Sequence, residues 1–183
     1  MSIGLWQKIV AKHSDAWCML QNVKRIGFDY LLRGNVMRAI GYSTWQGTWK
    51  EGTGTLSTES ETLKDKAYSF SSRFEGTPGG SPEELLGTAH AGCFNQALAN
   101  NFGMNDFIAQ SITTSVTVDL GYGDDGHPAI KSMHIVTQAS VPGIPEEMFR
   151  HCAERARTNC TLSKLFKCEI TMDATLHDVV YSV

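Results

Sequence analysis

Cysteine is the residue type through which this chain is best equipped to do covalent chemistry. Its 183 residues include five cysteines, Cys18, Cys93, Cys152, Cys160 and Cys168. An odd number of cysteines in a chain of this size argues against a framework of structural disulfides. The sequence contains neither a Gly-rich phosphate loop nor an HExxH zinc motif, so we expect free thiols that are either reactive or buried.

Two of these thiols lie where the sequence could make them reactive. Cys93 is in AHAGCF, inside an expected helix, where small neighbours would let another surface approach its sulfur. Cys160 is in TNCTLSK, at an expected helix junction, where the backbone N–H groups of a new helix can stabilise a thiolate. Each residue could instead be a small buried hydrophobe, which is the commoner role of a free cysteine.

Neighbouring residues leave a nucleophile pair open and disfavour a metal site. His90 precedes Cys93 by three residues and could act as the base of a Cys-His pair, although a histidine packed on the helix is the simpler interpretation. Cys152, Cys160 and Cys168 recur every eight residues, without the close cysteine pair typical of structural zinc sites. We therefore expect no bound metal.

The overall charge disfavours nucleic acid as a partner. The chain has 16 Lys and Arg against 19 Asp and Glu, a net charge of −3, so it has no basic excess with which to neutralise phosphates. It has no apolar run of about 18 residues, so we expect no membrane association through a spanning segment. Lys8, Lys12 and Asp15 interrupt any apolar stretch of a signal peptide, which predicts a cytoplasmic protein.

The pattern of residues predicts one folded domain behind an N-terminal extension. Residues 1–43 are assigned to the extension, which is partly helical because apolar side chains in residues 4–25 recur at helical spacing. Residues 44–183 are assigned to the domain. Its first segment, residues 44–59, combines Thr, aromatic residues and Gly pairs in the manner of a hairpin.

A strand and a long helix are predicted next. Residues 67–74 alternate aromatic and small polar side chains, which predicts a strand with Arg73 on the face opposite the aromatic residues. A helix should run from Pro82 to Asn101, with Ser81 as its N-cap and Glu84 completing a capping box. Its many small residues predict a buried, closely packed helix.

The remaining elements complete a mixed order of strands and helices. Residues 111–120 and 130–139 should form a hairpin, because GYGDDGHP between them is a strong turn signal. A helix is predicted for residues 145–159 and a short one for residues 161–166, followed by a strand at 168–176. The sequence contains no internal repeat.

Several of these segments together resemble a known family. The stretches GTGTLSTES, FSSRFEG, SPEELLGTAHAGCF, VPGI and NCTLSKLFKCEIT follow one another between residues 44 and 176. In this order they resemble the OsmC/Ohr family of thiol-dependent organic hydroperoxide reductases. The histidine in AHAGCF is similar to the OsmC branch. The resemblance implies an α+β fold, in which a curved antiparallel sheet wraps a buried central helix and two chains form an intertwined homodimer.

The resemblance also implies an activity and a set of site residues. Members of the family are peroxidases that reduce alkyl or fatty-acid hydroperoxides to alcohols in oxidative or osmotic stress defence, without metal, haem or flavin. Carried over by motif, Cys93 is the peroxidatic cysteine and Cys160 the resolving cysteine, while Arg73 and Glu83 complete the site. Thr161 departs from the family pattern, which usually has Pro after the resolving cysteine and so a tighter turn.

The chemistry of these residue types agrees with those roles. A peroxide is attacked by a thiolate rather than a thiol, so Cys93 needs a group that favours the anion. Arg73 is always charged and could stabilise both the thiolate and the departing alkoxide. Glu83 could hold Arg73 through a bidentate pair. The sulfenic acid left on Cys93 would then condense with Cys160 to give a disulfide.

Substrate, reductant and competing thiols follow from the same resemblance. We expect an apolar pocket, to which Phe74, Leu86 and Phe94 are assigned, and a preference for bulky organic peroxides over hydrogen peroxide. Recycling requires a dithiol reductant, for which a lipoylated protein is the candidate. Cys152 and Cys168 are extra thiols that could compete with the resolving cysteine.

The spacing of two site residues predicts that the site needs two protomers. Glu83 and Cys93 are ten residues apart in one predicted helix, a distance of about 15 Å along its axis. One guanidinium would not bridge that distance, so Arg73 and Glu83 are expected to act on Cys93 of a second chain. Two other functions stay open, a Cys-His hydrolase built on His90 and a non-catalytic small-molecule-binding member of the fold.

Overall fold

The structure, a computed structural model, describes residues 37–177. Residues Tyr42–Val183 belong to one compact unit. The helix predicted within residues 4–25 lies outside the described residues, and the domain boundary after residue 43 stays a prediction. In the described part of the chain, no helix combines the length and apolar character needed to cross a membrane.

The first three strands form a small sheet. They are β1 (Gly41–Gln46), β2 (Thr53–Thr58) and β3 (Lys66–Ser69), in the order β1-β2-β3, with β2 and β3 antiparallel. The hairpin predicted for residues 44–59 is therefore present. The ring of Trp45 packs on that of Tyr68 at a centroid distance of 5.3 Å and joins the two outer strands.

A short helix, α2 (Phe70–Phe74), replaces the second half of a predicted strand. The hydroxyl of Ser69 accepts a hydrogen bond from the backbone N–H of Ser72, and the hydroxyl of Ser72 accepts one from the N–H of Ser69. This reciprocal capping box begins a helix where alternation alone suggested a strand. The first and last residues of α2 place their rings 4.9 Å apart, at helical spacing. Arg73 therefore lies on a helix, and its predicted position on a strand is wrong.

The long helix α3 (Pro82–Met104) is the element on which most of the predicted site residues lie. Ser81 caps it as predicted, and Pro82 occupies its first turn. The helix runs past the predicted end, Asn101, to Met104. One face is buried at helical spacing, comprising Gly87, His90, Phe94, Leu98, Asn101 and Phe102. Much of the rest of its surface is exposed in the single chain, so the helix is buried on one side rather than all round.

A second sheet supports α3. Strands β4 (Ser111–Tyr122) and β5 (Pro128–Ser140) form the predicted antiparallel hairpin. Strand β6 (Glu169–His177) pairs with β5 in parallel, so the sheet is mixed and the prediction of a wholly antiparallel sheet is wrong for this pair. The parallel pairing of β5 and β6 follows from the helix between them. Parallel neighbours need a long crossover, and the predicted order of strand, helix and strand over residues 130–176 provides one.

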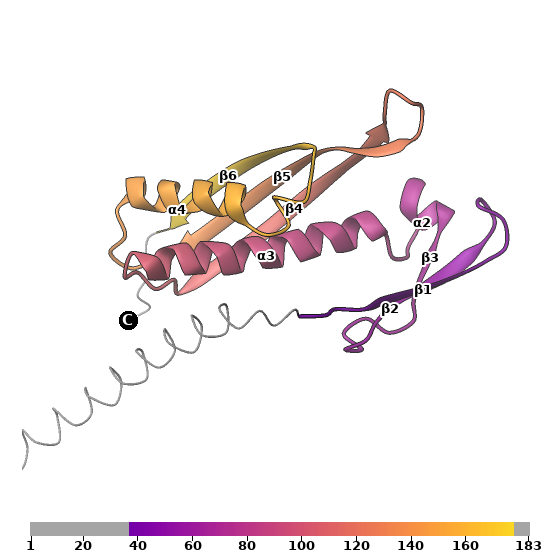
Figure 1. Ribbon diagram of the computed structural model, residues 1–183, viewed down its shortest axis with the longest axis horizontal. Helices are drawn as coiled ribbons and strands as arrows, with labels where there is room; N and C mark the ends of the chain where they lie inside the picture. The colour runs from indigo at the N-terminus through magenta and orange to yellow at the C-terminus, as the bar shows by residue number, and fades with distance from the viewer. Residues whose placement is uncertain (1–36, 178–183) are drawn as a thin grey trace, which may run out of the picture. The chain divides into compact units, whose positions relative to one another are not determined.

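That crossover contains α4 (Glu146–Asn159), which agrees with the helix predicted for residues 145–159. Figure 1 shows α3 and α4 next to the sheet of β4, β5 and β6. The core lies between these elements and is built by apolar side chains from α3, α4 and β5, including Phe94, Leu98, Phe102, Ile135, Ala139, Phe149 and Ala153. Burial of these side chains holds together α3, which carries Cys93, and α4, which Cys160 follows.

Candidate active site

The structure brings together the two cysteines that the sequence singled out. The thiol of Cys160 donates to the sulfur of Cys93 across 2.8 Å, although 67 residues separate them. Both are free thiols. Cys93 is partly exposed on α3, whereas Cys160 is 1% exposed and follows α4. One sulfur can therefore meet a small molecule while the other lies behind it, close enough to form a disulfide after a modest adjustment.

The segment after Cys160 is a series of turns, so the short helix predicted for residues 161–166 is wrong. The backbone N–H of Lys164 donates to the carbonyl of Cys160 at 3.2 Å, and that of Leu165 to the carbonyl of Leu162 at 2.9 Å. Thr161, which stands where the family usually has Pro, is exposed and leaves this turn intact. The turn still directs hydrogen-bond donors at the thiol, as a helix N-terminus would.

The pKa of Cys160 is set by opposing influences. Burial raises the pKa of the thiol above its ordinary value, and the hydrogen bond to Cys93 raises it further, because both favour the protonated form. The backbone N–H groups of Ser163 and Leu162, together with the hydroxyl of Ser163, lower the pKa without cancelling the rise. In this reduced state Cys160 is therefore a thiol that donates to Cys93.

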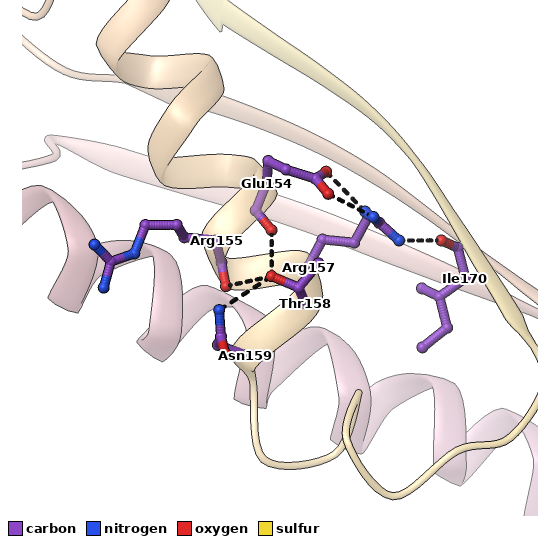
Figure 2. Close-up of polar contacts among 6 residues, drawn as sticks. All are labelled: Glu154, Arg155, Arg157, Thr158, Asn159 and Ile170. Atoms are coloured by element: carbon purple, nitrogen blue, oxygen red, sulfur yellow. Dashed lines mark hydrogen bonds and ion pairs between the residues drawn. The ribbon is translucent and has the colours of Figure 1, made fainter.

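The turn that carries Cys160 is fixed at both ends by Arg157. Figure 2 shows the side chain of Arg157 between α4 and β6. Its Nη1 donates to the carbonyl of Ile170 at 2.7 Å, and its Nε donates to Glu154 at 2.8 Å. The nearby ion pair raises the pKa of Arg157 and lowers that of Glu154. Because Arg157 precedes Cys160 and Ile170 follows the turn, this contact restrains the path between them.

His90 does not form the Cys-His pair that the sequence left open. Its ring is fully buried, and its Nε2 lies 2.9 Å from the hydroxyl of Ser163. No described group makes a hydrogen bond to its Nδ1. Burial lowers the pKa of His90, so the imidazole is neutral near pH 7. Ser163 was not among the predicted site residues, although its position three residues after Cys160, in a turn, was an available signal.

Arg73 and Glu83 form a second cluster, at the start of α3. The guanidinium donates through Nη2 to Oε1 of Glu83 at 2.6 Å and through Nε to Oε1 and Oε2 at 2.9 and 3.1 Å. The carboxylate side chain is 13% exposed and the guanidinium side chain 34%. Burial, the largest single influence, would raise the pKa of Glu83, but the hydrogen bonds from Arg73, the backbone and Ser81, together with the charge of Arg73, leave that pKa lowered. The Glu83 carboxyl is therefore ionised at neutral pH.

The loop between α2 and α3 positions this ion pair. Ser81 donates its hydroxyl to Oε2 of Glu83 at 2.9 Å, while the backbone N–H of Glu84 reaches the same hydroxyl at 3.4 Å. The hydroxyl of Ser72 donates to the carbonyl of Gly80. Gly79 has φ +151, and a Cβ there would lie 2.7 Å from the Cβ of Ser72, so only glycine fits this approach. The loop thus presents Glu83 to Arg73.

A cavity of about 570 Å³ lies beside the ion pair. It is lined by Arg73, Ser81, Glu83, Glu84, Gly87, Thr88, Ala91, Thr114, Ser115, Val116, Val118 and Leu120. The predicted lining residues Phe74, Leu86 and Phe94 are absent from it, so that prediction is wrong. Phe94 is instead wholly buried in the core. A Cβ at Gly87 would lie 2.8 Å from the carbonyl oxygen of Val116, so glycine lets α3 approach β4 below the cavity.

The two clusters are separate within one chain. Cys93 is not among the residues that line the cavity beside Arg73 and Glu83. Glu83 and Cys93 lie on the same continuous helix, ten residues apart, which corresponds to about 15 Å along its axis. The predicted contact of Arg73 with Cys93 of a second chain stays a prediction.

The remaining described cysteines differ in their surroundings. Cys152 is fully buried in the core, where burial raises its pKa, and Asn105 Nδ2 lies 3.8 Å from its sulfur. A buried protonated thiol is a poor nucleophile. Cys168 is partly exposed. Among the described residues, no group of three His, Cys, Asp or Glu side chains is arranged to hold a metal ion.

Comparisons of sequence place this architecture among known proteins. The OsmC-like protein family matches residues 74–175. The peroxiredoxin OsmC of Escherichia coli (strain K12) is 41% identical over 136 residues, which cover 74% of this chain and 94% of that protein. The peroxiredoxin OsmC of Shigella flexneri matches to the same extent.

Solved structures share the fold. An OsmC-like protein of unknown function from Vibrio cholerae has a TM-score of 0.61 and 15% identity, covering 76% of this chain and 99% of its own. The organic hydroperoxide resistance protein OhrB of Bacillus subtilis has a TM-score of 0.57 and 18% identity, covering 78% of this chain and all of its own. The α+β fold predicted from the resemblance is therefore confirmed, apart from the direction of β6, whereas the intertwined homodimer stays a prediction.

Proposed function

The chain belongs to the OsmC family and is an oxidoreductase of the peroxidase class, and we propose that it reduces organic hydroperoxides through a two-cysteine cycle. The contact between the sulfurs of Cys93 and Cys160 is the observation that carries this proposal. It supplies a partly exposed nucleophile and a buried partner within reach. The peroxide-reducing function of the E. coli relative supports the same class of reaction.

Cys93 carries out the first step. Its thiolate attacks the terminal oxygen of ROOH, the O–O bond breaks, and the departing alkoxide takes a proton to leave as ROH. The sulfur becomes a sulfenic acid. Because Cys160 is protonated in the reduced state and donates to Cys93, its hydrogen bond supports negative charge on the attacking sulfur.

Cys160 carries out the second step. It loses its proton and attacks the sulfenic sulfur of Cys93, the S–O bond breaks, and the hydroxide leaves with a proton as water. The product is a disulfide between Cys93 and Cys160. Cys160 rather than Cys152 is the proposed partner because its sulfur lies 2.8 Å from that of Cys93, whereas the thiol of Cys152 lies in the core beside Asn105.

Arg73 and Glu83 stabilise the charge that develops on oxygen. Two guanidinium nitrogens contact the Glu83 carboxylate, which fixes the orientation of the cation. The free part of the fork can then donate to the thiolate and to the alkoxide leaving group. Since the spacing along α3 separates this pair from the thiol of its own chain, the proposed site joins Arg73 and Glu83 of one protomer to Cys93 of another.

A homodimer is supported by surfaces that the single chain leaves uncovered. Small residues on the outer side of α3, Ala89, Gly92 and Ala99, are exposed and would let a second helix approach closely. Large apolar side chains are also exposed, among them Tyr42 at 53%, Trp49 at 63%, Ile108 at 80% and Leu165 at 70%. Apolar surface of this kind is typical of an interface.

The cavity supports an organic rather than a small inorganic peroxide. Val116, Val118 and Leu120 of β4 provide an apolar wall next to the charged pair. A peroxide with an alkyl or aryl group could bury that group on the wall and place its oxygens at Arg73. Recycling of the disulfide requires an external dithiol, and a lipoylated protein stays the candidate reductant.

Stopped-flow oxidation tests this function. Fully reduced protein is mixed with cumene hydroperoxide and, separately, with hydrogen peroxide, and the product is mapped by mass spectrometry. We expect much faster reaction with cumene hydroperoxide and a single disulfide joining Cys93 to Cys160. Slow oxidation by both peroxides would contradict the peroxidase cycle. A disulfide that used Cys152 or Cys168 would contradict the assignment of the resolving cysteine.

A further inference from the structure

Two polar residues lie on the buried side of the thiol pair, and the reaction described so far does not use them. His90 is fully buried and Ser163 is 8% exposed, and the His90 Nε2 lies 2.9 Å from the Ser163 hydroxyl. The His90 Nδ1 is one of two buried side-chain atoms in the described part that lack a hydrogen-bond partner. An apolar side chain would fill this space without leaving a nitrogen unpaired, so packing alone does not account for His90.

The tautomer of the neutral ring sets the direction of the His90–Ser163 hydrogen bond. His90 is neutral because it is buried, so its ring carries a single N–H. When Nε2 holds that hydrogen and donates to the oxygen of Ser163, the hydroxyl hydrogen is left to donate elsewhere. The sulfur of Cys160 is the acceptor in place, since the hydroxyl of Ser163 acts on this thiol and lowers its pKa.

The cycle makes two opposite demands on Cys160. In the reduced protein it must keep its proton, because it donates to Cys93. In the resolving step it must lose that proton, because a thiolate attacks the sulfenic sulfur. Oxidation converts the sulfur of Cys93 that accepted this hydrogen bond into a sulfenic acid, and the donors of the turn then determine how readily Cys160 ionises.

We propose that His90 and Ser163 are positioning residues for the resolving step. His90 holds the hydroxyl of Ser163 so that it donates to the thiolate of Cys160 as that thiolate attacks Cys93. The inference rests on the proposed two-cysteine cycle. One S–S bond forms, the S–O bond of the sulfenic acid breaks, and the proton given up by Cys160 leaves with the hydroxide as water, so no further reactant is needed.

Within the described residues of one chain, no cation acts on the thiol of Cys160. The groups that act on the Cys160 thiol are Cys93 on α3 and the donors of Leu162 and Ser163 in the turn. Arg157, in the last turn of α4, is bound by Glu154 and by the carbonyl of Ile170. A neutral hydrogen-bond chain is therefore the means of stabilising the thiolate that the described residues provide.

Single-turnover kinetics with the full chain test this inference. Cumene hydroperoxide is the oxidant, dimedone trapping reports the sulfenic acid, and mass spectrometry reports the disulfide. We expect His90→Leu and Ser163→Ala to keep the rate of sulfenic acid formation but to slow disulfide formation at least about tenfold, as one unit of thiol pKa would. The pH profile of disulfide formation should move to higher pH.

Two matched variants separate positioning from packing. His90→Gln places an amide N–H near the position of Nε2 and should restore the rate and the pH profile. Phe166→Leu changes the ring that contacts His90 at 5.3 Å but leaves the hydrogen bond, and should leave the pH profile unmoved. If His90→Leu and His90→Gln slow disulfide formation equally, or Phe166→Leu shifts the profile as far, the inference is overturned.

A second measurement does not depend on peroxidase activity. In the Cys93→Ser protein, the reaction of Cys160 with methyl methanethiosulfonate is followed against pH by mass spectrometry. We expect its midpoint to rise when Ser163→Ala is added. An unchanged midpoint would overturn the role of Ser163 even if the peroxide reaction proceeds as proposed. A raised midpoint without any peroxide reaction would instead show the failure to lie in the proposed function.

Discussion

Helix α3 carries Glu83 near its start and Cys93 ten residues later, and these two positions differ in how many of their reaction partners lie in the same chain. At Cys93 the partner sulfur of Cys160 is already 2.8 Å away, with His90 and Ser163 behind it. At Glu83 the partner Arg73 is in place and a cavity lies beside it, but no thiol lines that cavity. The Cys93 end, called the thiol end, therefore holds the two sulfurs, and the Glu83 end, called the arginine end, holds an oriented cation without a thiol beside it.

This difference indicates how the work is divided. Behind the partly exposed Cys93, the thiol end is buried and largely neutral, because His90 and Cys160 both favour uncharged forms there. The arginine end is charged and lies next to a cavity. We propose that the complete site, with both a nucleophile and a cation, is assembled only when the arginine end of another chain covers the thiol.

Substitution of the cysteines should have the largest effect. Cys93→Ser should reduce the rate of cumene hydroperoxide consumption by at least about a hundredfold, because a hydroxyl is scarcely ionised at neutral pH. Cys160→Ser should still consume one equivalent, then stop with a sulfenic acid on Cys93. Peroxide consumption and dimedone trapping measure both. Full turnover by Cys160→Ser would contradict the two-cysteine cycle and favour a hydrolase-like use of Cys93.

Removal of the cation should have the next largest effect. Arg73→Ala should slow oxidation of Cys93 by about 10²–10³-fold, the usual loss when a donor to a developing oxyanion is removed. Arg73→Lys keeps the charge but not the fork that grips Glu83, so its rate should fall between the two. Stopped-flow kinetics compare the three proteins. Disulfide formation from preformed sulfenic acid should be insensitive to either change. An equal slowdown of that step would contradict the separate roles of the arginine end and the thiol end.

The two ends should lose stability in different ranges of pH. The folded protein holds His90 neutral with a lowered pKa, so stability should fall as the pH drops below 6.5, by up to about 1.4 kcal/mol per pH unit. Glu83 also has a lowered pKa, so its contribution is complete above 4.5 and is lost only as the pH falls through its lower folded value. Urea unfolding against pH measures both.

Matched variants assign these two ranges. His90→Gln should flatten the decline just below pH 6.5, and Glu83→Gln should flatten only the decline below pH 4.5. If Glu83→Gln altered the first range, or His90→Gln left it unchanged, the contrast between a neutral end and a charged end would be wrong.

The smallest effect is expected for the contact that restrains the turn of Cys160. Arg157→Ala removes the bonds to Ile170 and Glu154 and should lower the free energy of unfolding by about 1–3 kcal/mol. Disulfide formation should slow more than the attack on peroxide, because the turn carries only Cys160. Arg150→Ala, which breaks an exposed pair with Glu146 on the same helix, is the control and should change neither rate.

Local sequence signals predicted most of the fold. Ser81 and Pro82 marked the start of α3, and GYGDDGHP marked the hairpin of β4 and β5. The strand predicted through Arg73 was wrong because period-two alternation of aromatic residues over eight positions also fits a capped helical turn. Ser69 and Ser72 decided between the two through a capping box of serines, which lacks the Glu or Gln of the usual signature.

The sequence predicted the four main residues of the candidate site better than it predicted the residues around them. Cys93, Cys160, Arg73 and Glu83 were singled out by motif, and the structure shows two contacting pairs among them. The cavity lining was not predictable, because it depends on which faces of α3 and β4 meet. Ser163 was missed because its contact with His90 joins positions 73 residues apart, and its place three residues after Cys160 was the one local signal for it.

Hybrid dimers test the central claim, that the arginine of one chain serves the thiol of the other. Chains carrying Arg73→Ala and chains carrying Cys93→Ser are co-expressed with different tags, and the mixed dimer is isolated and assayed with cumene hydroperoxide. Each variant alone is inactive or nearly so. The mixed dimer should recover about half of the wild-type activity, because it contains one intact site of two. A mixed dimer no more active than its parents would contradict the claim, since it would place both functions within a single chain.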